Sequence, residues 1–223
     1  DAKSDTDLHL ATSMRSFRSE NLSKMIHLLI NVDKEKTLTT YKKLANVYPI
    51  ALTRNLDKAK KWVLSHARAN ETKGLIASSG GIRLKPEGVF VKNRFNPKEW
   101  FLNESSDIRS CHYLEDVATE FDIQGLELDW CIVGWDADYR FNSNEFEHWK
   151  FVGSKWQRRN KEQDKRYLEN AYRVLLTRAR QGFIIFIPNG NDEDITRPKH
   201  YYNETYQFLK SCGLKDLDDE VHF

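Results

Sequence analysis

The sequence has few cysteines, and none is placed for a disulfide framework or a metal site. Cys111, Cys131 and Cys212 are odd in number, widely spaced and never part of a C-x-x-C pair. The seven histidines show no metal-ligand spacing either. We therefore expect no metal site, and the cysteine usage favours a reducing, cytoplasmic location.

Long apolar runs and a strong net charge are also missing. No segment has the roughly 18 uninterrupted apolar residues of a membrane span, and the polar start DAKSDTDLHL has no signal-peptide core, so we expect no membrane association. Lys and Arg (35) nearly balance Asp and Glu (33), so any affinity for nucleic acid must come from local basic clusters. Because the first residue is Asp, we expect a piece of a longer protein.

The signatures of a complete nucleotide-binding site are absent as well. No G-x-x-x-x-G-K-[ST] motif occurs, and SSGGIRL, residues 78–84, lacks both the spacing and the lysine that cradle phosphates. No segment matches the acidic Walker B pair that would hold magnesium. We therefore expect that this chain alone does not hydrolyse ATP.

What is present is the pattern of an α/β fold. With 223 residues and 39% hydrophobic content, the chain can bury a real core in one domain. Two runs, WCIVGW and FIIFIP, are apolar at nearly every position, as strands covered on both faces must be. Further strands are predicted at 48–53 and 74–79, and helices at 19–32, 55–69, 162–178 and 201–213. This alternation predicts an open, mostly parallel sheet with helices on both faces.

Three residues mark predicted helix ends. Ser19 and Asn55 are expected to cap helix N-termini, and Gly213 is expected to end the last helix. Two segments lack a clear pattern: residues 93–110 are predicted to be mostly connection, and residues 138–160 an insertion or loop. Both are assigned to a single domain that spans residues 1–223.

Two polar segments flank the two buried strands. In such folds ligands bind beyond the carboxyl ends of parallel strands, which makes these segments the first candidates for a site. In ATEFDIQGLELDW, residues 118–130, a glycine allows close backbone approach and Glu127 can accept hydrogen bonds from ribose hydroxyls. The alternative is a solvated loop with a capping carboxylate.

The second polar segment is VLLTRAR, residues 174–180, where Arg178 and Arg180 end a predicted helix. Two arginines at this place suit a phosphate ligand. Cations at a helix C-terminus are also stabilised by the macrodipole by roughly 0.3 to 1 kcal/mol, so ordinary capping is the alternative.

A third segment, residues 147–166, interleaves tryptophans with basic residues. Aromatic faces that stack bases, beside cations that neutralise phosphates, hold single strands without sequence preference. The candidate nucleic-acid contacts are Trp149, Lys155, Trp156, Arg158 and Arg159. The alternative is a solvated charged face with its tryptophans folded onto the core.

Together, the first two segments resemble motifs V and VI of superfamily 1 DNA and RNA helicases, in the variant of Schlafen-type helicase domains and their bacterial relatives. Four residues keep the spacing of motif V, namely Thr119, Gln124, Gly125 and Glu127. Motif VI ends in a Thr-Arg-Ala triplet whose arginine contacts the γ-phosphate of ATP in this family. This triplet is matched by Thr177, Arg178 and Ala179.

A third match lies near the start of the chain. LATSMRS resembles motif IV, in which a Leu is followed five residues later by a nucleotide-contacting Arg. Leu10 and Arg15 fit this pattern, and Arg18 competes with Arg15 for the role. The three motifs occur in the family's order between residues 10 and 187.

The resemblance implies that the chain is the second, C-terminal RecA-like domain of a helicase, with a P-loop NTPase-like fold that lacks the P-loop. ATP with magnesium would be held mainly by a first RecA-like domain that this chain does not contain. The γ-phosphate contacts would be Arg178 and Arg15, and the other nucleotide contacts Gln124, Gly125, Glu127 and Arg18. Thr119 would contact single-stranded DNA or RNA.

Two other interpretations stay open. One is a nucleic-acid-binding or partner-docking module that keeps the fold but serves no ATPase. The other is a metal-dependent nuclease built on Asp129, Asp136, Glu147 and Lys150. The nuclease is the weaker of the two, because the two aspartates bracket an apolar strand and no paired carboxylate-lysine arrangement follows.

Overall fold

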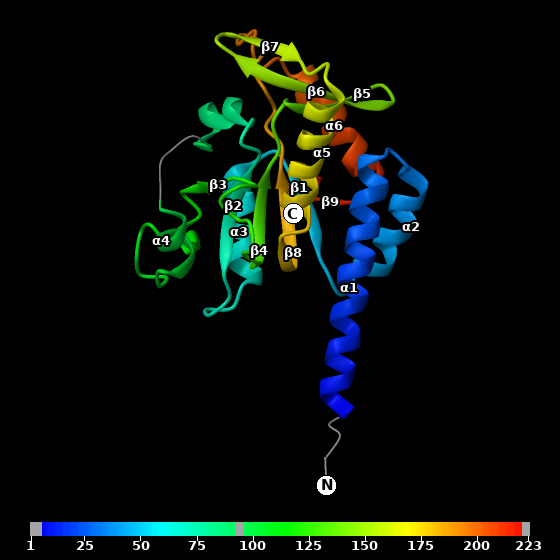
Figure 1. Cartoon of the computed structure of the whole chain (residues 1–223), viewed down its shortest axis with the longest axis vertical. Helices are drawn as coiled ribbons and strands as arrows, with labels where there is room; N and C mark the ends of the chain where they lie inside the picture. The colour runs from blue at the N-terminus through cyan, green and yellow to red at the C-terminus, as the bar shows by residue number, and fades with distance from the viewer. Residues whose placement is uncertain (1–5, 92–95, 220–223) are drawn as a thin grey trace.

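The main element of the structure is a six-stranded parallel sheet with the order β3-β2-β4-β8-β1-β9. The computed structural model describes residues 6–91 and 96–219, with side chains from residue 17 onward. The strands of this sheet are β1 (Ile50–Thr53), β2 (Lys73–Ala77), β3 (Val117–Ala118), β4 (Leu128–Gly134), β8 (Ala179–Phe186) and β9 (Lys215–Asp216). The predicted open, parallel α/β fold is therefore confirmed (Figure 1).

The two strongly apolar strands lie side by side in the centre of the sheet. β4 pairs with β8 in parallel, with Cys131 opposite Phe183 and Ile132 opposite Ile184. Alternate side chains of a strand point to opposite faces, so continuous apolar runs supply two cores at once. Cys131 and Phe183 belong to the core beneath α1, α5 and α6, whereas Ile132 and Ile184 belong to the core beneath α3.

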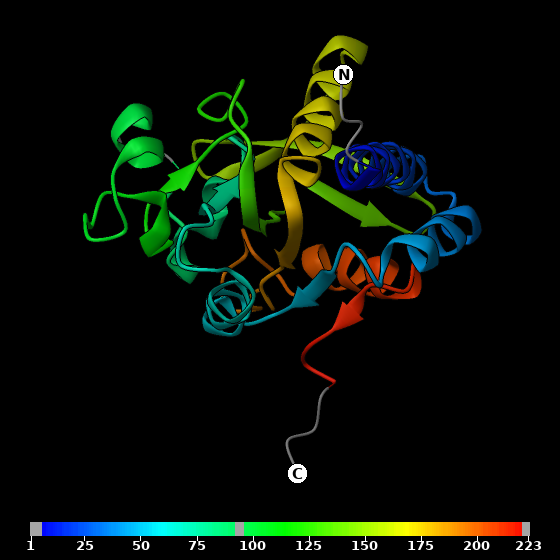
Figure 2. The ribbon, with the colours of Figure 1, turned by 90° about the horizontal axis from the view of Figure 1, so that it is seen from below.

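Helices cover both faces of the sheet, as predicted. They are α1 (Thr6–Ile30), α2 (Lys34–Leu44), α3 (Leu56–His66), α4 (Pro97–Leu102), α5 (Glu162–Leu176) and α6 (His200–Ser211), with short 3-10 helices η1 (Ile82–Glu87) and η2 (Cys111–Tyr113). Viewed along the strands, α3 lies on one side of the sheet and α1 and α5 on the other (Figure 2). Two predicted ends are confirmed: Asn55 accepts a hydrogen bond from the Lys58 backbone nitrogen, and Gly213 follows α6 with φ +88°.

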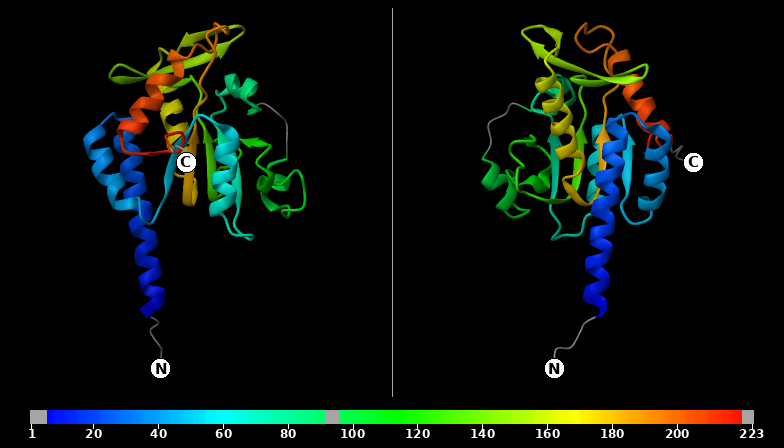
Figure 3. Two further views of the ribbon diagram at one scale, coloured as in Figure 1. Left: turned by 180° about the vertical axis from the view of Figure 1, so that it is seen from behind. Right: turned by 45° about the vertical axis from the view of Figure 1, so that its right-hand side comes forward.

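Other boundaries differ from the prediction. α1 begins at Thr6, so Ser19 lies inside the helix and the prediction of an N-cap there is wrong. Apolar periodicity starts only after residue 19, and the first half of the helix has no sheet to pack on, because it stands clear of the body (Figure 3). α2 was missed because its buried face includes Thr37 and Thr40. Residues 93–110 contain α4 in addition to connection.

Residues 138–160 form a second sheet where an insertion or loop was predicted. The antiparallel strands are β5 (Tyr139–Asn142), β6 (Glu145–Val152) and β7 (Lys155–Arg158). Each turn has two residues and one backbone φ in the left-handed region, at Ser143 (58°) and Gly153 (64°). Such turns join antiparallel strands tightly, so this segment is ordered by its own hydrogen bonds.

The two ends of the parallel sheet are covered differently. The β5–β7 sheet lies above the carboxyl ends of the strands in Figure 1, and the first half of α1 projects past their amino ends. Within the residues that the structure describes, no helix has the length and apolar character that a membrane crossing requires.

Candidate functional site

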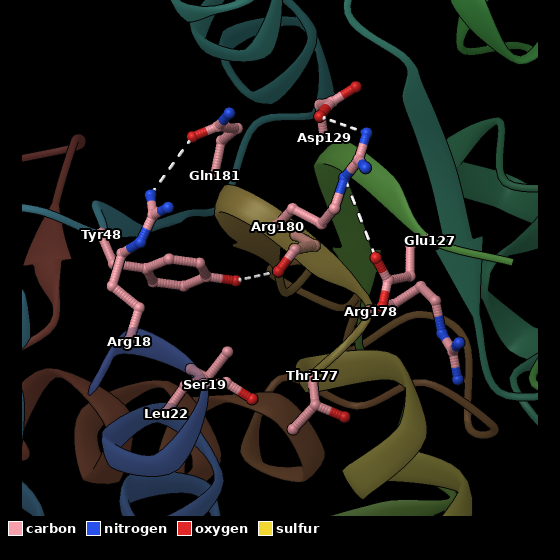
Figure 4. Close-up of a pocket in the computed structure, with 11 residues that line it drawn as sticks. Arg18, Ser19, Leu22, Tyr48, Glu127, Asp129, Thr177, Arg178, Arg180 and Gln181 are labelled. Atoms are coloured by element: carbon pink, nitrogen blue, oxygen red, sulfur yellow. Dashed lines mark hydrogen bonds and ion pairs between the residues drawn. The ribbon is translucent and has the colours of Figure 1, made fainter. Parts of the chain in front are cut away.

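Three segments that are distant in the sequence meet in a pocket of about 460 Å³ at the amino ends of the central strands. The pocket is lined by residues of α1 (Arg18, Ser19, Leu22), of the entry into β4 (Glu127, Asp129), and of the α5–β8 turn and the start of β8 (Thr177, Arg178, Ala179, Arg180, Gln181), together with Tyr48. Figure 4 shows the side chains. All three segments with helicase-like motifs therefore contribute to one pocket.

This position corrects the expected place of the site. The sequence placed ligands beyond the carboxyl ends of the strands, but Glu127 precedes β4 and Arg178 precedes β8. Both strands are parallel, so the residues that precede them meet at the amino edge. The general rule for open α/β sheets does not apply to this pocket, because the loops that line it enter the strands instead of leaving them.

Arg178 occupies the turn between α5 and β8. Its Nη1 donates to the Leu126 carbonyl oxygen at 2.6 Å, so the side chain is turned toward the loop that carries Glu127 (Figure 4). Its Nε is buried and has no hydrogen-bond partner among the described residues. Among the described residues the Nε atoms of Arg83, Arg140, Arg173 and Arg197 are in the same situation, so this feature does not set Arg178 apart.

Arg180 lines the same pocket but is engaged by carboxylates. Its Nη2 lies 2.8 Å from Asp129 Oδ1, and its Nε lies 4.0 Å from Glu127 Oε2. The second oxygen of Asp129 accepts from the backbone nitrogen and hydroxyl of Thr72, both at 2.9 Å. Asp129 thus joins the starts of β2, β4 and β8, and it neutralises Arg180 locally.

Of the two arginines predicted for motif IV, Arg18 is the one whose side chain the structure describes. It lines the pocket from α1, and its Nη1 is 3.4 Å from Gln181 Oε1. The buried Tyr48 beneath it donates to the Ala179 carbonyl oxygen at 2.7 Å, and burial raises the pKa of this phenol well above its usual value. The side chain of Arg15, which the sequence favoured for the same role, lies outside the described residues.

The motif V segment connects the two ends of the sheet. Thr119, just after β3, is buried and gives its backbone and hydroxyl hydrogen bonds to Asp122 at 2.8 and 2.7 Å. From there the loop runs to the amino end of β4, where Glu127 stands at the pocket rim. Gln124 and Gly125 are exposed on this loop and do not line the pocket; Gly125 has φ +77°, which favours glycine.

The predicted nucleic-acid tryptophans pack on an arginine of this chain. The guanidinium carbon of Arg140 lies 4.3 Å from the Trp149 ring centroid, 5.3 Å from that of Trp156 and 3.6 Å from that of Tyr201. Both indole nitrogens are also bonded, to Glu147 and to the Thr196 carbonyl oxygen. These contacts favour the alternative in which the tryptophans are part of the folded body.

The basic residues beside these tryptophans are partly engaged. Arg158 lies 3.5 Å from Glu145 and 3.4 Å from Glu147, and Arg159 Nε donates to the Trp149 carbonyl oxygen at 3.0 Å. Lys155 is exposed at the start of β7. Lys155 and Arg158 lie in the β5–β7 sheet at the carboxyl ends, and Arg159 directly follows it, so the structure does not join them to the arginine pocket.

A pair of buried carboxyl groups lies at the same end of the sheet. Asp138 accepts hydrogen bonds from the Tyr172 and Ser78 hydroxyls at 2.6 and 2.7 Å, and burial together with Asp136 raises the pKa of Asp138 to about 7. Asp136 accepts from the Tyr202 hydroxyl at 3.0 Å, and burial raises its pKa. Apolar neighbours in the sequence concealed this pair, which only the fold assembles.

The nuclease interpretation does not survive this geometry. Asp129 lies at the amino end of β4, Asp136 lies beyond its carboxyl end, and Glu147 is on β6. Among the described residues, no group of three or more histidines, cysteines or carboxylates is placed to hold a metal ion. Asp129 is therefore at the opposite end of the sheet from Asp136 and Glu147.

Comparison with known proteins identifies a family for the chain. No curated protein and no solved structure matches it significantly. The sequence model of one family, Schlafen group 3, DNA/RNA helicase domain, matches residues 1–189. This match includes all three motif segments and extends just past β8, which supports a helicase-related function. The chain belongs to the Schlafen group 3 DNA/RNA helicase domain family.

Proposed function

We propose that the chain is the second RecA-like domain of an ATP-dependent nucleic-acid helicase or translocase. The observation that carries this proposal is that Arg18 and Arg178 line one pocket with Glu127 at its rim. In Figure 4 the Arg178 guanidinium points away from Arg18, so a shared phosphate contact would require this side chain to turn inward. Each arginine alone fits an ordinary structural role. Their convergence from α1 and from the α5–β8 turn fits recognition of a polyanion such as the phosphates of ATP.

Arg178 is engaged by a weaker partner than Arg180 in the same pocket, a neutral carbonyl instead of a carboxylate. Its Nη1 is engaged by a neutral backbone carbonyl, and its buried Nε is unused within the described residues. A guanidinium has five N–H donors in a planar fork and binds phosphate oxygens two at a time. Because Nε is buried, a phosphate contact would exchange the Nη1 hydrogen bond to Leu126 for one to a phosphate oxygen.

The proposal requires a second domain. No Walker A or Walker B segment occurs in the sequence, so ATP with magnesium would be held mainly by a first RecA-like domain of the same protein. Bound there, the nucleotide supplies the phosphates and magnesium supplies counter-charge. This chain would add positioned guanidinium groups, from Arg178 and from Arg15 or Arg18, and Glu127 would accept from the ribose hydroxyls.

Domain closure would then control turnover. The arginines act only when they are correctly placed against the charge that develops on the transferred phosphate, so an open arrangement is inactive. Closing and opening coupled to a grip on single-stranded DNA or RNA would give translocation. The motif V loop suits this coupling because Thr119 is at one end of the sheet and Glu127 at the other.

A module that binds nucleic acid without serving an ATPase is the second candidate. It is favoured by the internal pairing of the pocket, in which Asp129 and Glu127 engage Arg180 and the Leu126 carbonyl engages Arg178. A pocket whose charges are partly satisfied from within holds its shape without a nucleotide. The two candidates differ in whether the complete protein hydrolyses ATP.

Phosphate release from ATP tests the proposal. The chain of residues 1–223 should unfold cooperatively on heating and release no phosphate. The complete protein should release phosphate, and single-stranded nucleic acid should accelerate the release. A complete protein that binds nucleic acid but never hydrolyses ATP would support the second candidate. Hydrolysis by the chain alone, abolished by Arg178→Ala, would contradict the proposal that a separate first domain holds ATP and magnesium.

A further inference from the structure

Two aromatic side chains form an exposed pair away from the arginine pocket. Phe121, in the motif V loop, and Tyr167, on α5, are each 49% exposed. Their ring centroids are 6.0 Å apart and the ring planes differ by 31°. Burying an aromatic ring is strongly favourable, so two adjacent rings left half in solvent require an explanation.

The surroundings of the pair do not resemble a protein-docking patch. Tyr167 follows the exposed Arg166, and the exposed residues on the same part of α5 include Gln163 and Asn170. Protein interfaces need a contiguous apolar area, whereas here two rings stand among polar groups. Isolated exposed aromatic faces fit a planar ligand that stacks on them.

Both elements that hold the rings end at the arginine pocket. The motif V loop leaves β3 beside Phe121 and reaches Glu127, and α5 runs from Tyr167 to the turn that carries Arg178. The Arg178 side chain bonds the Leu126 carbonyl oxygen, which ties the ends of the two elements together. A ligand bound to the rings would therefore contact both the motif V loop and α5, the two elements that position Arg178.

We propose that Phe121 and Tyr167 form a stacking platform for a base of single-stranded nucleic acid. This inference rests on the proposed helicase function and locates part of its nucleic-acid track. It also moves the stacking role away from Trp149 and Trp156, whose rings are packed on Arg140. The exposed ring faces supply stacking, which every base can accept, so the contact selects single strands without selecting sequence.

Binding of a fluorescent single-stranded oligonucleotide, as DNA and as RNA, to the chain of residues 1–223 tests the platform. Phe121→Ala and Tyr167→Ala should each weaken binding about 5- to 150-fold, the range that loss of one base–aromatic stack produces. The ratio between variant and wild type should stay the same as salt rises, because stacking releases no counterions. Phe121→Tyr and Tyr167→Phe, which keep an aromatic ring at each position, should bind with the affinity of the wild type.

A matched control is Tyr113→Ala, which removes another exposed aromatic ring, 43% accessible, outside the pair. It should leave binding unchanged. A photoreactive 5-iodouracil in the oligonucleotide gives a second measurement on the unaltered chain, and its cross-link should map to the peptides with Phe121 or Tyr167. If Tyr113→Ala weakens binding as much, or the cross-link maps elsewhere, the platform is wrong.

Three outcomes would contradict the platform, and they bear differently on the proposed function. Unchanged affinity of both alanine variants, with salt-sensitive binding by the wild type, would refute the platform and leave the helicase proposal standing. No binding of either oligonucleotide by the wild-type chain would refute the platform and also remove the nucleic-acid track from this domain. A lower melting temperature with unchanged affinity would show that the rings serve packing only.

Discussion

The two ends of the parallel sheet carry similar residue types but satisfy them differently. At the carboxyl ends, Arg140 is 4% exposed and enclosed by three aromatic rings, and Asp136 and Asp138 accept hydrogen bonds from tyrosines. At the amino ends, Arg178 is engaged by one carbonyl and Arg18 by one amide oxygen at 3.4 Å. At the first end, Arg140 and the two aspartates are thus enclosed by other side chains, and a pocket of about 320 Å³ lies beside them at Glu145, Arg158 and Lys165. At the second end, the arginines themselves line a pocket of about 460 Å³.

The difference shows that composition does not distinguish a binding surface from a scaffold. Arginines and tryptophans in residues 147–166 suggested a nucleic-acid contact, yet the structure turns their rings toward Arg140. Two arginines at a helix end suggested a phosphate contact, with capping as the alternative. In the structure Asp129 engages one of them and a backbone carbonyl the other. The partners of each group, which only the fold supplies, decide between the two roles.

The largest expected effect concerns Arg178. Arg178→Ala in the complete protein should lower kcat for ATP by about 10³ to 10⁵, the range of arginine fingers, because charge developing in the transition state loses its guanidinium. Nucleotide binding should fall much less, since the other domain would supply most of it. Arg178→Lys should not restore kcat, because an ammonium lacks the planar fork. Steady-state ATPase kinetics measure both parameters.

Arg180→Ala is the matched control for this prediction. Arg180 lines the same pocket, but Asp129 already engages its guanidinium at 2.8 Å. We therefore expect a smaller loss of kcat than for Arg178→Ala. Equal, modest losses for the two variants, with a stability change of at most about 1 kcal/mol, would identify the α5–β8 turn as an ordinary helix terminus.

The second largest effect should be on stability at the opposite end. Trp156→Ala should lower the free energy of unfolding by roughly 2 to 4 kcal/mol, because Trp156 covers Arg140 and bonds the Thr196 carbonyl oxygen. Urea unfolding measures the loss, and nucleic-acid affinity of the folded variant should be unchanged. A variant that keeps its stability but loses affinity would restore the stacking role predicted from the sequence.

A pH-dependent effect should follow from Asp138. Its pKa is raised from 3.8 to about 7, so the folded state keeps a proton that the unfolded state releases. The free energy of unfolding should therefore fall as pH rises from about 4 to about 7. Asp138→Asn removes this titration and should be more favourable, relative to wild type, at pH 8 than at pH 5, by about 1 to 3 kcal/mol.

Asp107→Asn serves as the control for this pH dependence. Hydrogen bonds from Arg109 lower the pKa of Asp107 to about 2, so its carboxylate stays ionised from pH 5 to pH 8. The slope of stability against pH in that interval should match the wild type. An unchanged slope for Asp138→Asn as well would show that the buried pair holds no proton near neutral pH.

The sequence predicted the sheet better than the site. Continuous apolar runs identified β4 and β8, since strands buried on both faces have no other pattern. Motif spacing predicted Arg178 and Glu127 as nucleotide contacts, and both line one pocket, but at the amino ends of the strands instead of the expected carboxyl ends. Nothing in the local pattern revealed that Arg140 would occupy the tryptophan faces, which depends on the β5–β6 pairing. Nor did it reveal that Phe121 would meet Tyr167, which lies 46 positions later in the chain.

The smallest expected effect tests whether the β5–β7 sheet, at the carboxyl ends of the strands, contacts nucleic acid. Lys155 is exposed at the start of β7, and Arg158 on the same strand lies near Glu145 and Glu147. If the β5–β7 sheet contacts the nucleic-acid backbone, Lys155→Gln should weaken binding a few-fold and lower the slope of log affinity against log salt by about 1. Arg158→Gln should do less, because two carboxylates already offset that charge. If neither variant changes the slope, the carboxyl end is scaffold throughout, and nucleic-acid contacts belong to other surfaces of the domain.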